Sequence, residues 1–268
     1  MLLFLIACSS LVAGFACAEL PAKAIQDNSF FIEEAYNQEP DVVQHILSVP
    51  AFFSSGDGDL SVNFTQEWPL FGQRHQFSYS VVHGGTKEGA AFGDTRLNYR
   101  LQALTEEGCV PAFAPRFTLI IPTGDAAKGF GHGRPGYEVN LPLSKVVSDR
   151  ITLHWNAGGS FFPAVNGRDL WSGNLGGSVI YAVTENFNLM LESVAAWEQD
   201  IDRHGKVGQS VDALLSPGAR WALNFPNALQ IVVGIGAPMA LTPASPDWGI
   251  FFYLSFEHPF VRCTPSRL

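Results

Sequence analysis

A two-residue alternation of apolar and polar side chains runs through most of this chain and limits what it can fold into. The alternation is cleanest over 93–104, where Leu97, Tyr99 and Leu101 are separated by polar residues. Successive side chains of a β-strand point to opposite faces, so this period predicts strands with one apolar and one polar face. Beyond the N-terminus the chain has no apolar run of about 18 residues, the length of a transmembrane helix. The predicted fold class is therefore all-β.

Turn residues divide the alternating region into about eleven predicted strands. They span 59–68, 73–82, 93–104, 111–122, 136–146, 150–162, 171–183, 187–198, 210–223, 228–238 and 248–260. Bacterial single-chain barrels have an even number of strands, and Ser29–Tyr36 is the candidate for the missing first one. Residues 37–58 are then an outer loop or a plug, with a short helix around Val42–Leu47.

A soluble β-sandwich alternates in the same way, with its apolar side chains buried between two sheets. Three features favour a transmembrane, antiparallel, up-and-down barrel of about 12 strands, of the outer-membrane type. The strands have roughly ten to thirteen residues, more than the five or six usual in soluble sheets. Aromatic residues such as Trp171 and Trp221 lie near strand ends on the apolar face, as in interfacial girdles. Arg, Glu, His and Asn lie in mid-strand on the opposite face, which suits a wet lumen.

The composition and the connections fit the same architecture. Only 15% of the 268 residues are charged, and the mean hydropathy is +0.11, which suits a surface that faces lipid. Short turns alternate along the chain with longer, Gly-rich loops, such as 123–135 and 163–170. Outer-membrane barrels have short turns at one rim and longer loops at the other.

The two ends of the chain are predicted to lie outside the barrel. Residues 1–18 read as a signal peptide, with an apolar core followed by the small-x-small site Ala16-Cys17-Ala18. No Lys or Arg precedes that core, which leaves the true start open, and Leu5–Cys8 resembles a lipoprotein lipobox. The barrel then covers 19–262, and 263–268 is a C-terminal tail. Two cysteines remain after the predicted signal peptide, Cys109 and Cys263. They either form a disulfide or remain two separate thiols.

Several phrases of the chain carry a resemblance to a known family. They are IEEAYNQEPDVVQHI (32–46), GDTRLNYRLQ (93–102), PAFAPRFTLIIPTGD (111–125), NLPLSKVVSDRITLHWNAG (140–158) and FFYLSFEHPF (251–260). They resemble the outer-membrane transporter family named after the MetA pathway of phenol degradation. The resemblance implies an outer-membrane barrel with a transport role, and it names no substrate. The chain departs from the usual pattern of such barrels by continuing beyond Phe260.

The polar face of the strands is expected to line the lumen. Eight ionisable residues on it are candidate ligand-binding or pore-lining residues: Arg96, Arg100, Arg116, Glu138, His154, Glu192, Asp212 and Arg220. In one interpretation they form interior ion pairs that hold a narrow barrel closed. In the other, Arg96, Arg100 and Arg116 on adjacent strands form a basic ladder that attracts an anionic or aromatic-acid solute.

The sequence offers little support for catalysis or cofactor binding. No Gly-x-Ser-x-Gly elbow is present, and His154, Asn156 and Ser160 share a face that points to the lumen rather than to lipid. No metal-site spacing is found and no cofactor is expected. The Gly-rich stretch after the strand 111–122 leads to another strand, so it does not read as a phosphate-binding loop. A net charge of −9 argues against nucleic acid as a partner.

These features predict a channel or transporter for passive passage of small solutes, aromatic or hydrophobic ones included. A barrel of about twelve strands is intermediate between filled eight-stranded barrels and open 16-stranded porins. The alternatives are an occluded structural or surface-interaction barrel and an outer-membrane enzyme of the phospholipase type. The expected partners are outer-membrane lipid, a small solute, and the barrel-assembly machinery through the final strand ending at Phe260.

Overall fold

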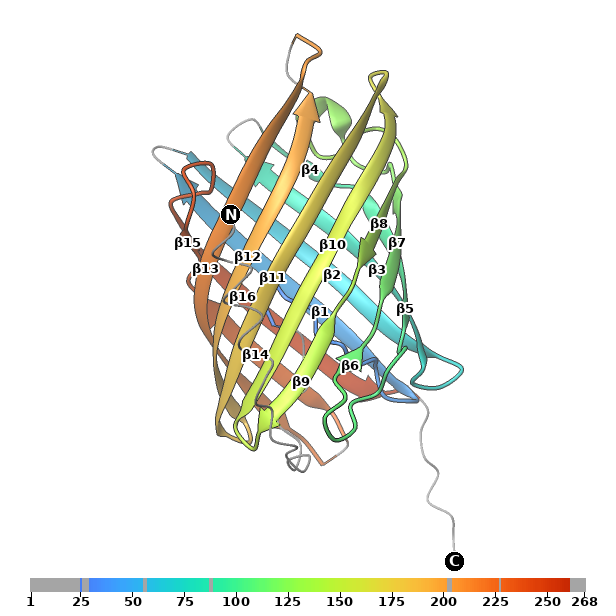
Figure 1. Ribbon diagram of the computed structural model, residues 1–268, viewed down its shortest axis with the longest axis vertical. Helices are drawn as coiled ribbons and strands as arrows, with labels where there is room; N and C mark the ends of the chain where they lie inside the picture. The colour runs from blue at the N-terminus through green and yellow to red at the C-terminus, as the bar shows by residue number, and fades with distance from the viewer. Residues whose placement is uncertain are drawn as a thin grey trace, which may run out of the picture.

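The computed structural model describes residues 25, 29–54, 57–86, 89–201, 204–226 and 228–260. Apart from residues 25 and 29–41, the described chain is mostly β-strand and encloses a barrel (Figure 1). The strands are β1 (Val42–Ser54), β2 (Asp57–Leu70), β3 (His75–Thr86), β4 (Gly89–Phe92), β5 (Thr95–Leu101), β6 (Ala112–Phe113), β7 (Arg116–Ile121), β8 (Gly136–Asn140), β9 (Leu143–Ser148), β10 (Ile151–Val165), β11 (Arg168–Thr184), β12 (Phe187–Ile201), β13 (Val207–Asn224), β14 (Gln230–Gly236), β15 (Met239–Ala240) and β16 (Trp248–Pro259), with one 3-10 turn, η1 (Ala126–Lys128). The predicted signal peptide and the tail 263–268 lie outside the described residues.

Twelve antiparallel barrel strands form the closed ring, which confirms the predicted fold class. Four of them are interrupted and therefore carry two labels each: β4–β5, β6–β7, β8–β9 and β14–β15. Pro115, Pro142 and Pro238 lie in three of the interruptions, where a residue without an N–H breaks the ladder. The ring closes where β1 pairs with β16, from Val42 opposite Pro259 to Phe53 opposite Trp248.

The outward face of the barrel is apolar, and aromatic pairs lie near both of its rims. Leu175 is 65% exposed and Ile235 is 52% exposed. At one rim the rings of Phe161 and Trp171 are tilted against each other, with centroids 4.2 Å apart. At the other, Phe187 meets Trp221 at 6.0 Å. An apolar band between two aromatic girdles is typical of outer-membrane barrels.

The first strand lies later in the chain than the sequence predicted. Ser29–Tyr36 is not a strand, and 37–58 is neither an outer loop nor a plug with a helix, because β1 covers Val42–Ser54 and β2 begins at Asp57. The inward side chains of β1 include the apolar residues Ile46 and Phe52, which pack against other apolar side chains inside the barrel. The strand therefore has no clean polar face, and its sequence lacks the alternation seen in the other strands.

The two rims of the barrel differ. The turn rim is the one at which β1 begins and β16 ends, and the loop rim is the opposite one, which carries η1 (Figure 1). At the loop rim β10 and β11 continue into a two-residue turn, Asn166-Gly167, with positive φ angles of 47° and 78°. Positive φ at both positions suits the tight turn of a twisted hairpin, so the loop predicted at 163–170 is mostly strand. Among the described residues, no helix is long and apolar enough to cross a membrane.

Candidate functional site: the lumen and its internal segment

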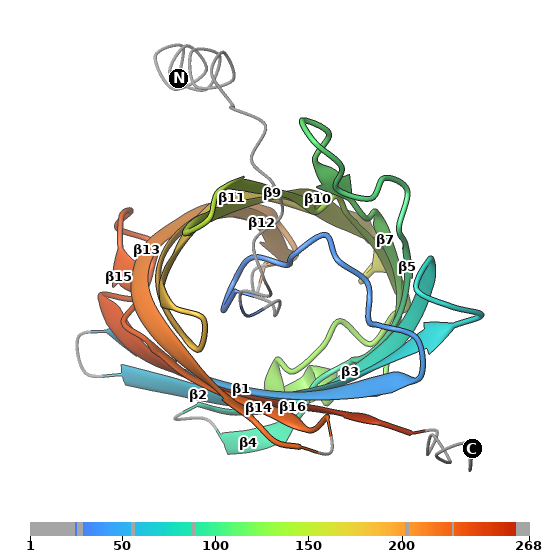
Figure 2. The ribbon, with the colours of Figure 1, turned by 90° about the horizontal axis from the view of Figure 1, so that it is seen from below.

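Residues 29–41, named here the luminal segment, run inside the barrel without joining its sheet. Seen along the barrel, this part of the chain crosses the interior before it enters β1 (Figure 2). Asp41 turns the segment into β1 with a φ of 63°. Its carbonyl oxygen accepts a hydrogen bond of 2.9 Å from Phe260 N, just beyond β16. The segment is thus attached at the seam of the ring.

The aromatic end of the luminal segment fits into a recess made by glycines. Phe30 stacks on Phe251 with centroids 5.1 Å apart. A Cβ atom built on Gly218, Gly234 or Gly236 would lie 2.6, 2.7 or 2.9 Å from the Phe30 ring. The barrel wall therefore accommodates this ring only because three inward positions lack a side chain.

Buried carboxylate and guanidinium groups hold the same end of the chain. Glu192 on β12 is 1% exposed. Its Oε1 accepts hydrogen bonds from Phe31 N at 2.9 Å and Ile32 N at 3.2 Å. Arg220 on β13 donates to the carbonyl oxygen of Ile25 at 3.1 Å. These contacts satisfy backbone groups that have no partner in a strand ladder.

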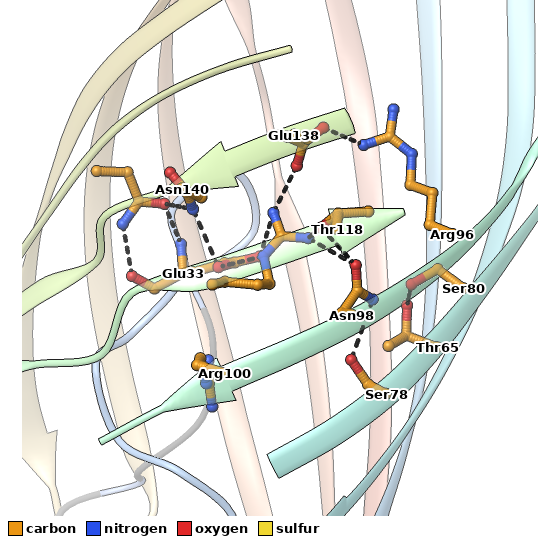
Figure 3. A network of polar contacts seen from close by, with 12 residues as sticks. Glu33, Thr65, Ser78, Ser80, Arg96, Asn98, Arg100, Thr118, Glu138 and Asn140 are labelled. Carbon is orange, nitrogen blue, oxygen red and sulfur yellow. Dashed lines mark hydrogen bonds and ion pairs between the residues drawn. The ribbon is translucent and has the colours of Figure 1, made fainter. Parts of the chain in front are cut away.

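Arg116 on β7 is the centre of an ion-pair network in the lumen. Its partners Glu33, Asn98 and Glu138 are labelled in Figure 3. Its guanidinium lies 3.0 Å from Glu33 and 2.8 Å from Glu138, and it donates to Asn98 Oδ1 at 3.0 Å. Glu138 also pairs with Arg96 at 2.6 Å. The network joins the luminal segment to β5, β7 and β8, and each guanidinium in it has a carboxylate partner.

Arg100 on β5 holds the backbone of the luminal segment. It donates to the carbonyl oxygens of Glu34 at 3.2 Å and Tyr36 at 2.6 Å, and to Asn37 Oδ1 at 2.9 Å. The residue is 4% exposed, so these bonds replace water almost completely. Arg100 faces Arg116 directly across the β5–β7 ladder, and carbonyl and carboxylate oxygens surround the two charges.

Ser144 on β9 and His154 on β10 form a buried pair that was not predicted from the sequence. Ser144 Oγ lies 2.6 Å from His154 Nδ1 and also accepts a hydrogen bond of 2.7 Å from Ala35 N. Both residues are buried inside the barrel, at 0% and 2% exposure. In this arrangement the serine oxygen binds the luminal segment and is not presented to lipid.

A second polar cluster fixes the luminal segment at the turn rim. Tyr36 Oη donates to Glu106, and Glu106 pairs with Lys145 at 2.8 Å. Burial and the neighbouring Glu106 raise the pKa of Tyr36 well above its usual range. In the same turn Cys109 is disulfide-bonded. The sequence left open whether Cys109 pairs with Cys263, and Cys263 lies outside the described residues.

The described residues line three cavities along the lumen and its mouths. One of about 830 Å³ opens at the loop rim and is lined by residues including Arg96 and Glu138. One of about 220 Å³ lies between the luminal segment and the wall, with Arg116 among its lining residues. A third, of about 670 Å³, lies at the turn rim beside Tyr36 and Gln102. The luminal segment therefore lies between the two larger cavities.

The structure brings seven of the eight predicted residues into contact with the internal chain or with its ion-pair network. Four of them bind the luminal segment or Ile25 before it: Arg100, Arg116, Glu192 and Arg220. Arg96 and Glu138 complete the ion-pair network around Arg116. His154 reaches the luminal segment through Ser144. Asp212, partly buried on β13 opposite Ala196, is not joined to them by any described contact. This arrangement favours interior pairing over an unpaired basic ladder, and a direct role in solute binding stays a prediction.

The uncharged wall residues that bind the luminal segment were missed. They include Gln73, Gln76, Gln102, Asn140, Ser144, Asn156 and Ser178. One available signal was Phe251, the apolar exception on the inner face of the last strand, which packs on Phe30 and Phe31. An inward aromatic ring in a polar lumen indicates an apolar partner inside the barrel.

Among solved structures, the chain matches a NanC porin with a TM-score of 0.51 and 9% sequence identity, over 79% of this chain and 98% of that one. The chain has the fold of an outer-membrane β-barrel. Weaker matches are the KdgM porin in complex with disordered oligogalacturonate (TM-score 0.45, 10% identity, 82% of this chain, 99% of that one) and the toluene transporter TodX of Pseudomonas putida (TM-score 0.42, 9% identity, 91% of this chain, 100% of that one). No family model matches the sequence, and no curated protein matches it.

Proposed function

We propose that this protein is a passive outer-membrane channel for small solutes, narrowed by its own luminal segment. The observation that carries the proposal is the series of cavities along a polar lumen, with residues 29–38 between the two rims. A closed barrel with an apolar exterior suits a lipid bilayer, and its polar interior suits water and solute. Passage then requires the luminal segment to move or the solute to pass beside it.

The expected solutes are small and include aromatic or hydrophobic molecules. The 220 Å³ cavity supports this, because Phe30, Phe31 and Tyr253 line one part of it while hydroxyl groups such as Ser80 line another. Cavities of about 150 Å³ with apolar walls hold a benzene ring. The family resemblance to outer-membrane transporters supports the same role, and membership of that family is part of the proposal.

The outer membrane is the proposed location. Lipid would contact the apolar band, and the assembly machinery would recognise the final strand, β16, with Phe260 directly after it. In this position Phe260 packs near Trp68, with ring centroids 5.4 Å apart.

Single-channel conductance in a planar bilayer tests the proposal. Ser29 Oγ and Ser178 Oγ lie 2.8 Å apart, close enough for a disulfide after Ser29→Cys and Ser178→Cys. We expect discrete steps for the wild type, smaller or rarer steps for the oxidised double variant, and recovery after reduction. The Ser178→Cys variant and reduced wild type are the controls, because Cys109 is itself disulfide-bonded. Inserted barrels that show no steps in either redox state would overturn the channel assignment.

An occluded structural or surface-interaction barrel is the second candidate. The many hydrogen bonds to the backbone of the luminal segment favour it, because they hold the segment inside the lumen. We do not propose an enzyme. The Ser144–His154 pair is buried and already bound to Ala35 N, and a phospholipase assay of wild type beside Ser144→Ala provides the check.

A further inference from the structure

The wall of the lumen binds the main chain of the luminal segment more than its side chains. Between Glu33 and Gln38, four of the segment's N–H groups donate to four different wall side chains. The pairs are Glu33 N to Asn156 Oδ1 at 2.9 Å, Ala35 N to Ser144 Oγ at 2.7 Å, Asn37 N to Gln102 Oε1 at 2.9 Å, and Gln38 N to Gln76 Oε1 at 2.6 Å. Any non-proline residue offers such an N–H group, so these contacts do not depend on the sequence of the segment.

The carbonyl groups of the same residues are bound as well. Five consecutive ones, from Glu33 to Asn37, accept hydrogen bonds from Asn156, Arg100, Gln102, Arg100 and Gln73 in that order. Backbone groups buried away from water need such partners. We name the wall residues Gln73, Gln76, Arg100, Gln102, Ser144 and Asn156 the main-chain track.

Two amides of the track imitate the edge of a β-sheet. Asn156 accepts from Glu33 N and donates to Glu33 O, at 2.9 and 2.8 Å. Gln102 accepts from Asn37 N and donates to Ala35 O, at 2.9 and 2.7 Å. Proteins that add a peptide strand to a sheet edge recognise main-chain groups by the same pairing of donors and acceptors.

Side-chain selection is strict at one position of the segment. Ala35 has no exposed surface and packs against Ala112 and Ala114, which are also completely buried. A larger side chain at position 35 has no room there. Directly after the bound residues 33–38, Glu39 and Pro40 are exposed. The connection to β1 therefore lies outside the closely packed part of the segment.

We infer that the main-chain track is a peptide-binding site, which takes an extended peptide with a small residue at its centre and is filled here by residues 33–38 of the same chain. A covalently attached ligand has an effective concentration in the millimolar range, so a free peptide cannot displace it from the intact protein. Once the attached segment is excluded, the track binds the same sequence supplied as a separate peptide.

The test uses the full-length chain with Ala35→Arg, which blocks the attached segment and leaves every track residue unchanged. The probe is a fluorescent peptide of residues 31–40, FIEEAYNQEP, and binding is followed by anisotropy on the refolded, detergent-solubilised barrel. We expect saturable binding to the variant and none to the wild type. Methylating the peptide nitrogens at positions 35 and 37 removes two track bonds and should weaken binding at least tenfold, since the buried oxygens Ser144 Oγ and Gln102 Oε1 each lose a donor. A peptide with Arg at position 35 should not bind.

A second full-length variant, Phe30→Ala with Glu33→Ala, covers the case in which Ala35→Arg does not refold. It removes the aromatic anchor and the ion pair to Arg116, which weakens the attached segment and spares the track. Absence of binding to a refolded variant, or equal binding of the N-methylated peptide, would overturn the inference. The assay measures no conductance, so its result is independent of the channel assignment.

Discussion

The ring of Phe30 occupies the space in which a side chain of Gly234 would lie. A Cβ atom on Gly234 would be 2.7 Å from Phe30 Cε1, and its nearest other neighbour would be Ala219 O at 3.3 Å. The luminal segment and the wall of β14 are therefore fitted to each other at this point.

Gly234→Ala should lower the free energy of unfolding by about 1–3 kcal/mol, the usual cost of overpacking a filled site. Urea unfolding in lipid vesicles, followed by tryptophan fluorescence, measures the change. Phe30→Ala in the same background should recover part of it, because the clash disappears with the ring. Gly173→Ala is the control, since a Cβ there would have only ordinary contacts of 3.6 Å or more. Equal effects at the two glycines would contradict the fit.

Arg116→Ala should destabilise the barrel by about 3 kcal/mol, because it removes a shared partner of Glu33 and Glu138 inside the lumen. Arg96→Ala should cost less than about 1 kcal/mol, since the Arg96 side chain is 41% exposed and solvent screens its pair. The same unfolding assay compares the two variants. A smaller loss for Arg116 than for Arg96 would show that the luminal segment is not held through this network.

Tyr36 should remain neutral at alkaline pH. Its folded pKa is raised by burial and by the hydrogen bond to Glu106, while an unfolded tyrosine ionises near about pH 10. The resulting stability is complete below that pH and decreases as the pH rises further, because only the unfolded phenol then loses its proton. Absorbance titration of wild type and Tyr36→Phe should give the same tyrosinate signal up to about pH 11. A larger signal in the wild type over that range would show that Tyr36 ionises normally.

Leu175→Arg should impair insertion into lipid by about 2–4 kcal/mol, because Leu175 lies outward near the middle of β11. Leu223 lies at the turn-rim end of β13. Leu223→Arg should therefore raise the free energy of insertion by at most about 1 kcal/mol. Folding into vesicles across a denaturant series gives both values. Equal costs for the two variants would contradict the prediction that Leu175 lies near the bilayer midplane and Leu223 near its surface.

Eleven of the twelve barrel strands could be predicted from the sequence. In these strands apolar side chains on the outer face alternate with mostly polar side chains on the luminal face. The prediction failed at β1 because Ile46 and Phe52 turn inward and pack within the barrel near Ile25 and Phe31. Because both faces of β1 carry apolar residues, its sequence does not show the alternation of apolar and polar side chains that identifies the other strands. Ser29–Tyr36 was predicted as the twelfth strand only because an even number of strands was expected. Its aromatic residues Phe30 and Phe31 pack inside the barrel instead.

The candidate charged residues were found because ionisable groups in mid-strand are conspicuous. Their partners were not predictable in the same way. Arg116 meets Glu33 only because the chain before β1 folds back into a ring that β16 completes. Neutral residues such as Gln102 and glycines such as Gly218 have no distinctive pattern until the position of the luminal segment is known.

The luminal segment also has a mechanical consequence. It binds Gln76 on β3, Ser144 on β9 and Glu192 on β12, strands that are not neighbours around the ring. A hollow cylinder of hydrogen-bonded strands resists stretching but flattens easily, because flattening breaks no bond in the wall. An internal strut tied to several sides opposes that distortion, so we expect the cross-section of this barrel to stay fixed while the segment is in place and to become variable when it leaves.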